Sequence, residues 1–340
     1  MSNWQESAEA IGAVDRVLAS VGMKHGRRAT RKGTWEKGER VKSKKISVDK
    51  INTRAAGRGK KRAGKLPGGV RAVLVPGWER FPWLAAGFST RLGGVSKAYG
   101  PDEQNLGWTG QDAEENVAEN RRGFVEAVAG KTRVELVTVR QIHSGLIRVV
   151  EKDHGPLVTA NGRAILRGDA TMTDVPGLLL GVQTADCVPV LVVDVKKKVV
   201  AAFHAGWRGT VARIVEHGVA KMKEEYGARV EDLVAAVGPS IGVCCYSVGK
   251  EVREKFEREF GYGEELFRVG SEDDLEDMYL DLWEANLRQL MDAGLAEEQI
   301  TMVGECTACT RGEDGALRYF SHRGEQGVAG RMLNVVGVVG

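Results

Sequence analysis

Short apolar segments rich in Val, Ile and Leu recur from residue 70 onward, and they constrain the fold more than any other feature of the chain. Turn-forming residues bound each segment, which is typical of β-strands. Several segments are apolar at consecutive positions, so helices or a second sheet must cover both faces of the sheet that they form. The segments are VRAVLVPG, ELVTVRQIH, LIRVVE, LLLGVQT, VPVLVVD, KVVAAFH, LVAAVGP and QITMVGE.

Helical patterns lie between these predicted strands, so the chain is expected to mix α and β structure. A chain of 340 residues, 42% of them hydrophobic, can bury a large core without disulfides. Its apolar stretches are far shorter than a bilayer span, which excludes an integral membrane protein built from helices. No internal repeat, Rossmann glycine fingerprint or P-loop is present. The predicted helices are Asn116–Ala129, Arg208–Tyr226, Glu251–Phe260 and Leu280–Ala293.

The first 65 residues differ from the rest in charge. They hold 18 Lys and Arg against 6 Asp and Glu, whereas residues 66–340 hold 31 against 40. Beyond a possible helix at 4–22, this segment has almost no apolar periodicity, so we expect a disordered basic tail over 1–65 and a globular part over 66–340. Three interpretations of the tail remain open: a solvated tail, an upstream extension translated from a wrongly chosen start, or a weak nucleic-acid contact. An early acid and no apolar leader argue against secretion and for a cytoplasmic protein.

Ligand-type side chains stand at the ends of three predicted strands: His143, Cys187 and His204. Three protein ligands with an open fourth position describe a catalytic zinc site, and the same set also suits copper. Two other interpretations remain open. The three residues are ordinary hydrogen-bonded core residues, or Cys187 and one histidine form a nucleophile pair.

The other four cysteines are weaker candidates. An odd total of five does not describe a secreted disulfide scaffold, so a reducing compartment is expected. Cys306 and Cys309 have CxxC spacing, but a structural zinc site needs two more ligands. Cys244 and Cys245 are adjacent, and adjacent cysteines rarely reach one metal well. We therefore expect buried or loop thiols at all four positions.

Arginines in glycine-rich turns form a second group of candidates. Arg91 lies in GFSTRLGG, Arg208 begins a predicted helix, and Arg323 and Arg331 lie in FSHRGEQG and GVAGRMLN. A helix N-terminus already favours an anion, and guanidinium groups bind phosphate or carboxylate in a bidentate manner. The alternative for each arginine is a surface ion pair.

Taken together, the segments resemble the laccase-domain family, also called multicopper polyphenol oxidase-like, whose members are described as purine nucleoside phosphorylases. The resemblance covers residues 66–340 and is most specific in TADC, HAGWRG and GPSIGVCCY; it also includes GDATMTD, RQIHSG and YFSHRGEQGVAGRMLNVV. It implies an α+β fold in which mixed β-sheets pack together, flanked by helices, as a single globular domain. Two departures are Ser247, where the family often has an acid, and His322, where a tyrosine is usual.

The resemblance implies a zinc site on His143, Cys187 and His204, and it places Arg91 at the active site. It implies phosphorolysis of adenosine, inosine and S-methyl-5'-thioadenosine, together with hydrolytic deamination of adenosine. Zinc activates water for attack on C6 of adenine, which suits the deamination. For phosphorolysis, Arg91 and Arg208 are the candidates that hold phosphate, and Asp186 is a candidate substrate-binding residue.

Two other functions compete with this prediction. A copper-dependent polyphenol oxidase with a trinuclear cluster needs many histidines, but residues 66–340 hold only five and no His-x-His pair. A nucleic-acid binder that acts through the tail leaves the polar residues at the strand ends unexplained. The expected partners are therefore purine nucleosides and phosphate, and the expected cofactor is zinc, with copper as the alternative metal.

Overall fold

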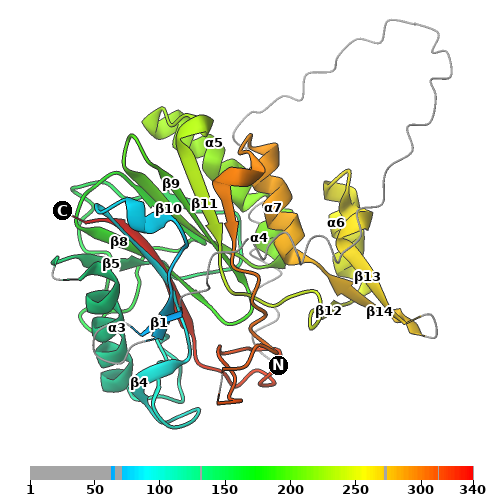
Figure 1. Ribbon diagram of the computed structural model, residues 1–340, viewed down its shortest axis with the longest axis horizontal. Coiled ribbons are helices and arrows are strands. Elements are labelled where there is room, and N and C mark those ends of the chain that lie inside the picture. Colours follow the sequence, from blue (N-terminus) through cyan, green and yellow to red (C-terminus); the bar gives the residue numbers. More distant parts are fainter. Residues whose placement is uncertain (1–62, 66–70, 131, 272–273, 313, 340) are drawn as a thin grey trace, which may run out of the picture. The chain divides into compact units, whose positions relative to one another are not determined.

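The computed structural model describes residues 63–65, 71–130, 132–271, 274–312 and 314–339 (Figure 1). The expected disordered tail and its helix at 4–22 lie outside the described residues, with one exception. Residues 63–65, on the tail side of the expected boundary, form strand β1 (Ala63–Lys65), which pairs antiparallel with β2 (Arg71–Val73). The boundary itself stays a prediction.

The first sheet has six strands in the order β1-β2-β3-β16-β8-β5. The last strand of the chain, β16, lies in its middle and pairs antiparallel with β3 and β8, whereas β5 joins β8 in parallel. Besides β1, its strands are β2 (Arg71–Val73), β3 (Leu84–Ser89), β5 (Glu135–Thr138), β8 (Leu178–Thr184) and β16 (Met332–Val338). A short strand, β4 (Leu92–Ser96), follows β3.

The second sheet also has six strands, in the order β15-β11-β9-β10-β7-β6, and a small third sheet has the order β12-β14-β13. In the second sheet, β9, β10 and β7 are antiparallel neighbours, and β11 pairs in parallel with β15. The bounds are β6 (Ile147–Val149), β7 (Ala170–Thr173), β9 (Val188–Asp194), β10 (Val199–Ala205), β11 (Leu233–Val237), β12 (Ser247–Val248), β13 (Phe267–Ser271), β14 (Asp274–Leu280) and β15 (Ile300–Met302). With its helices, this arrangement confirms the predicted α+β fold.

The four predicted helices are confirmed, and one of them is divided. The helical pattern expected from Arg208 to Tyr226 breaks where Arg213 adopts a left-handed conformation with φ 52°. Its guanidinium pairs there with Glu216 and Glu259, which holds the break in place. The helices are α3 (Glu114–Ala129), α4 (Trp207–Val211), α5 (Ile214–Tyr226), α6 (Lys250–Glu259) and α7 (Leu282–Asp292), with 3-10 turns η2 (Trp78–Arg80), η3 (Val230–Asp232), η4 (Gly263–Leu266) and η5 (Glu297–Gln299). Within the described ranges, no helix is long and apolar enough to cross a membrane.

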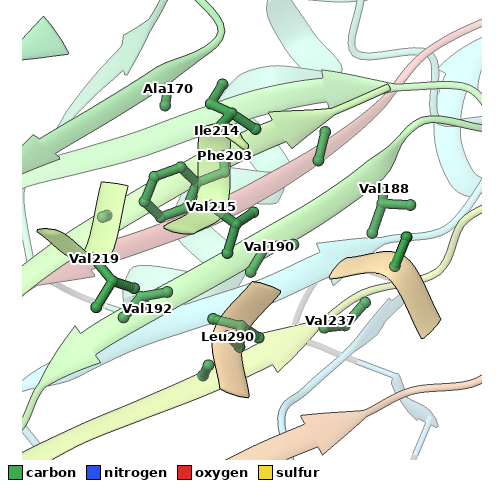
Figure 2. Close-up of a cluster of buried hydrophobic side chains, with 14 of the residues drawn as sticks. Ala170, Val188, Val190, Val192, Phe203, Ile214, Val215, Val219, Val237 and Leu290 are labelled. Atoms are coloured by element: carbon green, nitrogen blue, oxygen red, sulfur yellow. The ribbon is translucent and has the colours of Figure 1, made fainter. Parts of the chain in front are cut away.

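The central strands are buried on both faces, which explains their continuous apolar sequence. Successive side chains of a strand point to opposite faces. In β9, Val190 and Val192 pack under α5 and α7, whereas Leu191 and Val193 pack against the first sheet. Figure 2 shows the helix-side cluster, in which the Phe203 ring of β10 lies beside Ile214 and Val215 of α5. A third cluster fills the space between α3 and the first sheet.

All eight segments predicted as strands contain a strand, but other strands lie outside those segments: β1, β3, β4, β7, β12, β13, β14 and β16. In β7 the sequence ATMT offers one strongly apolar residue, although all four positions are buried. In β16 the apolar run contains Asn334, whose side-chain amide donates to the carbonyl of Val182 and to the Thr184 hydroxyl. A polar residue satisfied inside a central strand hides that strand from an analysis of apolar patterns.

Removal of residues 1–62 is expected to leave folding and turnover unchanged, because the sequence predicts that the globular part begins near residue 66. Removal of residues 1–65 also deletes β1, a three-residue partner of β2 at the end of the sheet order. That second truncation should lower the melting temperature slightly and leave turnover intact. Thermal unfolding of both truncated chains, and their turnover of the substrates that the resemblance implies, compared with the full chain, test this. Failure of either truncated chain to fold would contradict the predicted boundary.

Candidate metal centre

The three ligand-type residues at the strand ends converge on one point. His143 lies in the loop after β5, Cys187 lies in the connection that crosses from β8 of the first sheet to β9 of the second, and His204 is in β10. One ligand atom from each lies within 4.8 Å of the other two. The imidazole rings of His143 and His204 are 4.9 Å apart and nearly perpendicular. The structure therefore brings together all three residues of the predicted metal site.

Asp169 holds both histidines in place, and it was not among the predicted site residues. Its fully buried carboxylate accepts a hydrogen bond from His204 Nδ1 at 2.9 Å. It accepts another from the backbone N–H of His143, also at 2.9 Å. It further accepts hydrogen bonds from the backbone N–H groups of Ile142 and Ser144 and from the Ser144 hydroxyl. His143 is thereby kept in a left-handed conformation with φ 57°. A carboxylate behind a ligating histidine fixes the ring and leaves its other nitrogen for a metal.

The charges of this group depend on one another. Burial alone would raise the pKa of the Cys187 thiol, but the charge of His204 and hydrogen bonds with both histidines lower it to about 6. Burial would lower the pKa of His204, but the Cys187 thiolate and the Asp169 carboxylate raise it to about 9. Burial likewise opposes ionisation of Asp169, yet His204 and Ser144 hold its pKa below the ordinary value. The sulfur is therefore a thiolate near neutral pH, which is the form that binds metals.

The backbone around Cys187 is shaped for this placement. Asp186 has a φ of 96°. Its carboxylate accepts hydrogen bonds from the hydroxyls of Thr307 and Ser321 and from the backbone N–H of Arg323. Three donors thus hold a strained turn that aims the next residue at the histidines. Gly206 lies against the same group, since a Cβ there would stand 2.8 Å from the Cys187 sulfur. Only glycine allows the backbone to approach so closely.

A pocket with a volume of about 840 Å³ opens beside the three ligands. All three line it, as do the aromatic side chains of Trp108 and Tyr246. Four arginines but only one carboxylate, that of Asp186, are among the lining residues, and His322 is there too. The arginines are Arg140, Arg163, Arg323 and Arg331. The pocket is therefore of a size for a small molecule and strongly cationic.

Arg91 and Arg208, predicted to hold phosphate, are not among the residues that line this pocket. The buried Arg91 guanidinium bonds to Glu103 through Nε and Nη2, pairs with Glu325 through Nη1 at 3.2 Å, and stacks over Phe320. Arg208 lies over the Trp207 ring. Arg323 and Arg331, which the sequence places in glycine-rich turns, do line the pocket. Arg140 and Arg163 also line it, but no glycine-rich turn marked them in the sequence. The phosphate role of Arg91 and Arg208 stays a prediction.

The donor set fits a metal ion. Tetrahedral zinc with bonds of about 2.0–2.3 Å places its ligand atoms roughly 3.3–3.8 Å apart, and the three ligand atoms here lie within 4.8 Å of one another. His143 is exposed and Cys187 half-buried on the pocket side, so a fourth coordination position would open into the pocket. The alternative function, a Cys–His nucleophile pair, needs only one histidine. Here two histidines face Cys187 and Asp169 holds both of them, which favours a metal site over that pair.

With this geometry established, comparison with known proteins is informative. The chain belongs to the family described as multi-copper polyphenol oxidoreductase laccase, whose model matches residues 85–339. It is 34% identical over 248 residues to a purine nucleoside phosphorylase of Bacteroides thetaiotaomicron, covering 72% of this chain and 88% of the relative. It is 38% identical over 177 residues to the adenosine deaminase RL5 of an unknown prokaryotic organism, covering 52% and 66%.

Solved structures agree with the fold. The crystal structure of YlmD from Geobacillus stearothermophilus has a TM-score of 0.69 and 30% identity, over 83% of this chain and 98% of that one. The hypothetical protein YfiH of Bacillus licheniformis also gives 0.69, with 31% identity, over 78% and 96%. The predicted membership of the laccase-domain family is therefore confirmed.

Substitution of Asp169 by asparagine is expected to weaken metal binding about 10- to 100-fold, the usual effect of losing a carboxylate behind a ligating histidine. Asparagine keeps the size but removes the charge that faces His204. Competition with a chromophoric chelator measures the affinity. Asp153→Asn, at an exposed position outside the pocket, is the control. Equal affinities of the two variants would show that Asp169 does not support the ligands.

Proposed function

We propose that this chain is a zinc-dependent purine nucleoside phosphorylase that acts on adenosine, inosine and S-methyl-5'-thioadenosine and also deaminates adenosine. One observation carries the proposal: a group of two histidines and one cysteine opens into a cationic pocket of nucleoside size. The names of the relatives support it, since they include purine nucleoside phosphorylases and an adenosine deaminase.

The pocket offers each part of the substrates a chemical partner. Arginine side chains suit phosphate because a guanidinium donates two parallel hydrogen bonds to its oxygens. Arg140 is the first candidate, because it is exposed in the pocket, lies in the same loop as His143, and forms no ion pair with the described residues. Trp108 and Tyr246 provide flat apolar surfaces for a purine ring.

The two reactions use the same nucleoside but different nucleophiles. In phosphorolysis, phosphate attacks C1′ of the ribose, the glycosidic bond breaks, and the base leaves, giving ribose 1-phosphate. In deamination, water attacks C6 of adenine and ammonia leaves, giving inosine. A bound zinc ion supplies Lewis-acid activation for the hydrolytic reaction. The chain's own residues orient the ligands: Asp169 keeps the proton on His204 Nδ1, and Asp186 holds the turn before Cys187.

The copper-dependent polyphenol oxidase remains the alternative that the family name suggests. A trinuclear copper cluster needs many histidines in contact. In the described part of the chain, the only histidines that gather with other ligand-type residues are His143 and His204. His154 and His217 join no such group, and His322 lies in the pocket without one. This distribution supports a mononuclear site.

Incubation of the purified protein with adenosine, with and without phosphate, tests the proposal. Chromatography should show adenine and ribose 1-phosphate only when phosphate is present, and inosine in both cases. Metal analysis of the same sample should find zinc. Oxidation of a phenolic substrate with consumption of oxygen, in a sample that contains copper, would favour the alternative.

Replacement of Arg91 by lysine decides between its predicted phosphate role and the ion-pair role that its contacts suggest. Because Glu103 and Glu325 already occupy the guanidinium, we expect phosphorolysis and deamination to fall together, with the KM for phosphate unchanged. The single ammonium group of lysine cannot pair with both carboxylates as the planar guanidinium does. The free energy of unfolding should therefore fall by about 1.5–3 kcal/mol. Arg140→Lys is the matched variant and should raise the KM for phosphate. A selective loss of phosphorolysis in Arg91→Lys would support the predicted phosphate role instead.

A further inference from the structure

The four cysteines outside the candidate metal centre also form one group. Cys244 and Cys245 follow β11, and Cys306 and Cys309 follow β15. These two strands are parallel neighbours, so their carboxyl ends lie at the same edge of the sheet. The four sulfur atoms all lie within 4.8 Å of one another, and those of Cys244 and Cys309 are 3.7 Å apart. From the sequence we expected buried or loop thiols at these positions. The structure brings the four together, so that Cys244 and Cys245 could supply the two further ligands that the CxxC segment lacks.

The spacing of these sulfurs is that of a mononuclear site. A tetrahedral ion with metal–sulfur bonds of about 2.3 Å holds its four sulfurs about 3.8 Å apart. A disulfide needs its two sulfurs at about 2.05 Å, far closer than the 3.7 Å between Cys244 and Cys309. A four-iron cluster binds each cysteine to a different iron, so its ligand sulfurs stand farther apart than the edges of one tetrahedron.

The backbone around the sulfurs is organised as in a ligand-bearing turn. The Cys245 N–H donates to the Gly242 carbonyl, and the Thr310 N–H donates to the Cys306 carbonyl, so each pair of cysteines sits in a closed turn. The Gly242 N–H donates to the buried Cys306 sulfur at 3.2 Å. Such a hydrogen bond stabilises a thiolate in the manner of the partners that surround metal ligands in proteins.

We propose that Cys244, Cys245, Cys306 and Cys309 bind a second zinc ion in four-sulfur coordination, as a structural site separate from the candidate metal centre. Four protein ligands close the coordination sphere, so this site holds the fold together and leaves no position for substrate. Soft thiolate ligands select zinc over the harder divalent cations. Together the two sites account for all five cysteines of the chain.

The second site would fasten the two loops that form one wall of the pocket. Thr307, between the two cysteines of the CxxC segment, donates to Asp186 at 2.7 Å, and Asp186 sets the position of Cys187. Tyr246, directly after Cys245, lines the pocket itself. The loops already join through Thr307 N–H to the Ser240 carbonyl. A zinc ion bound by the four cysteines would link the two loops by four further bonds. Loss of the zinc should therefore make Asp186 and Tyr246 more mobile together.

Zinc analysis of the full chain carrying His143→Ala and Cys187→Ser isolates the second site, because this variant keeps only the four clustered cysteines. We expect one zinc per chain after dialysis. The same chain with Cys244→Ser and Cys309→Ser added is the matched control and should hold none. No zinc in the first variant, iron in its place, or equal zinc in both variants would overturn the proposal.

Alkylation of the unmodified chain gives a second measurement that does not depend on how the variants fold. Cys244 and Cys309 are exposed, so free thiols there are accessible to a reagent. With zinc bound, peptide mapping should find both unreactive to iodoacetamide, and both should react after a strong chelator is added. Rapid alkylation of the zinc-loaded chain, or an intact mass lower by the two hydrogens of a disulfide, would overturn the proposal. Neither measurement uses turnover, so a failure of the proposed phosphorolysis is seen separately.

Discussion

Replacing His204 by alanine is expected to remove the metal from the candidate centre and to reduce both phosphorolysis and deamination more than 100-fold. His204 contributes a ring that Asp169 holds by its other nitrogen, so no neighbouring group can take its place. Loss of a supporting carboxylate alone costs about 10- to 100-fold, and loss of a ligand must cost more. Zinc content and turnover of the same preparation measure the effect.

His217→Ala is the matched control for this variant, since His217 is exposed on α5 and belongs to neither ligand group. It should keep full metal content and full activity. Retention by His204→Ala of the full zinc content of the unmodified chain, with turnover also retained, would remove His204 from the proposed ligands. Retention of that full zinc content with loss of turnover would instead indicate a Cys–His nucleophile pair.

Replacing Phe203 by alanine is expected to destabilise the protein by about 3–5 kcal/mol, the range for a fully buried aromatic ring. The ring lies in the cluster under α5 and is completely buried (Figure 2). Urea unfolding followed by tryptophan fluorescence measures the change. Phe81→Ala, at a half-buried position, should cost much less. Similar losses from the two variants would mean that the Phe203 ring is not part of a closely packed core.

A second substitution makes the Phe203 prediction sharper. A Cβ on Gly218 of α5 would stand 2.0 Å from the Phe203 ring, so Gly218→Ala should destabilise the protein despite the higher helix propensity of alanine. In the Phe203→Ala background the same change fills the space that the ring has left. We therefore expect Gly218→Ala to be destabilising alone and stabilising in the double variant, a reversal of sign that only direct contact produces.

The parts of the fold that could be predicted are those with a local signal. Runs such as VPVLVVD are apolar at every position because the strand is covered on both faces, and this pattern is visible without a structure. In strand β16 the polar residue Asn334 interrupts the apolar pattern. Asn334 can be buried there because its amide donates hydrogen bonds to groups of β8, more than a hundred residues earlier in the chain. Its place in the middle of the first sheet follows from pairing alone, which no local pattern encodes.

The candidate metal centre shows the same division. His143, Cys187 and His204 were predicted because each ends an apolar strand. Asp169 escaped notice because its importance lies in five hydrogen-bond donors gathered from distant segments, although GDATMTD places it just before a strand. The four-cysteine group was missed because it depends on the parallel pairing of β11 with β15. Arg91 has a glycine-rich turn suited to an anion, but the anions that it binds here are carboxylates of the chain itself.

Strand β10 carries Phe203 and His204 at consecutive positions, so one strand supplies both the helix-side core and the candidate metal centre. Their side chains point to opposite faces of the sheet. Because the two residues are adjacent, a backbone shift at one of them displaces the other. A ligand that binds only the folded form stabilises it by an amount that grows with the logarithm of ligand concentration. Chains weakened in the core at Phe203 should therefore be rescued by added zinc, and chains stripped of zinc should tolerate fewer changes in that core.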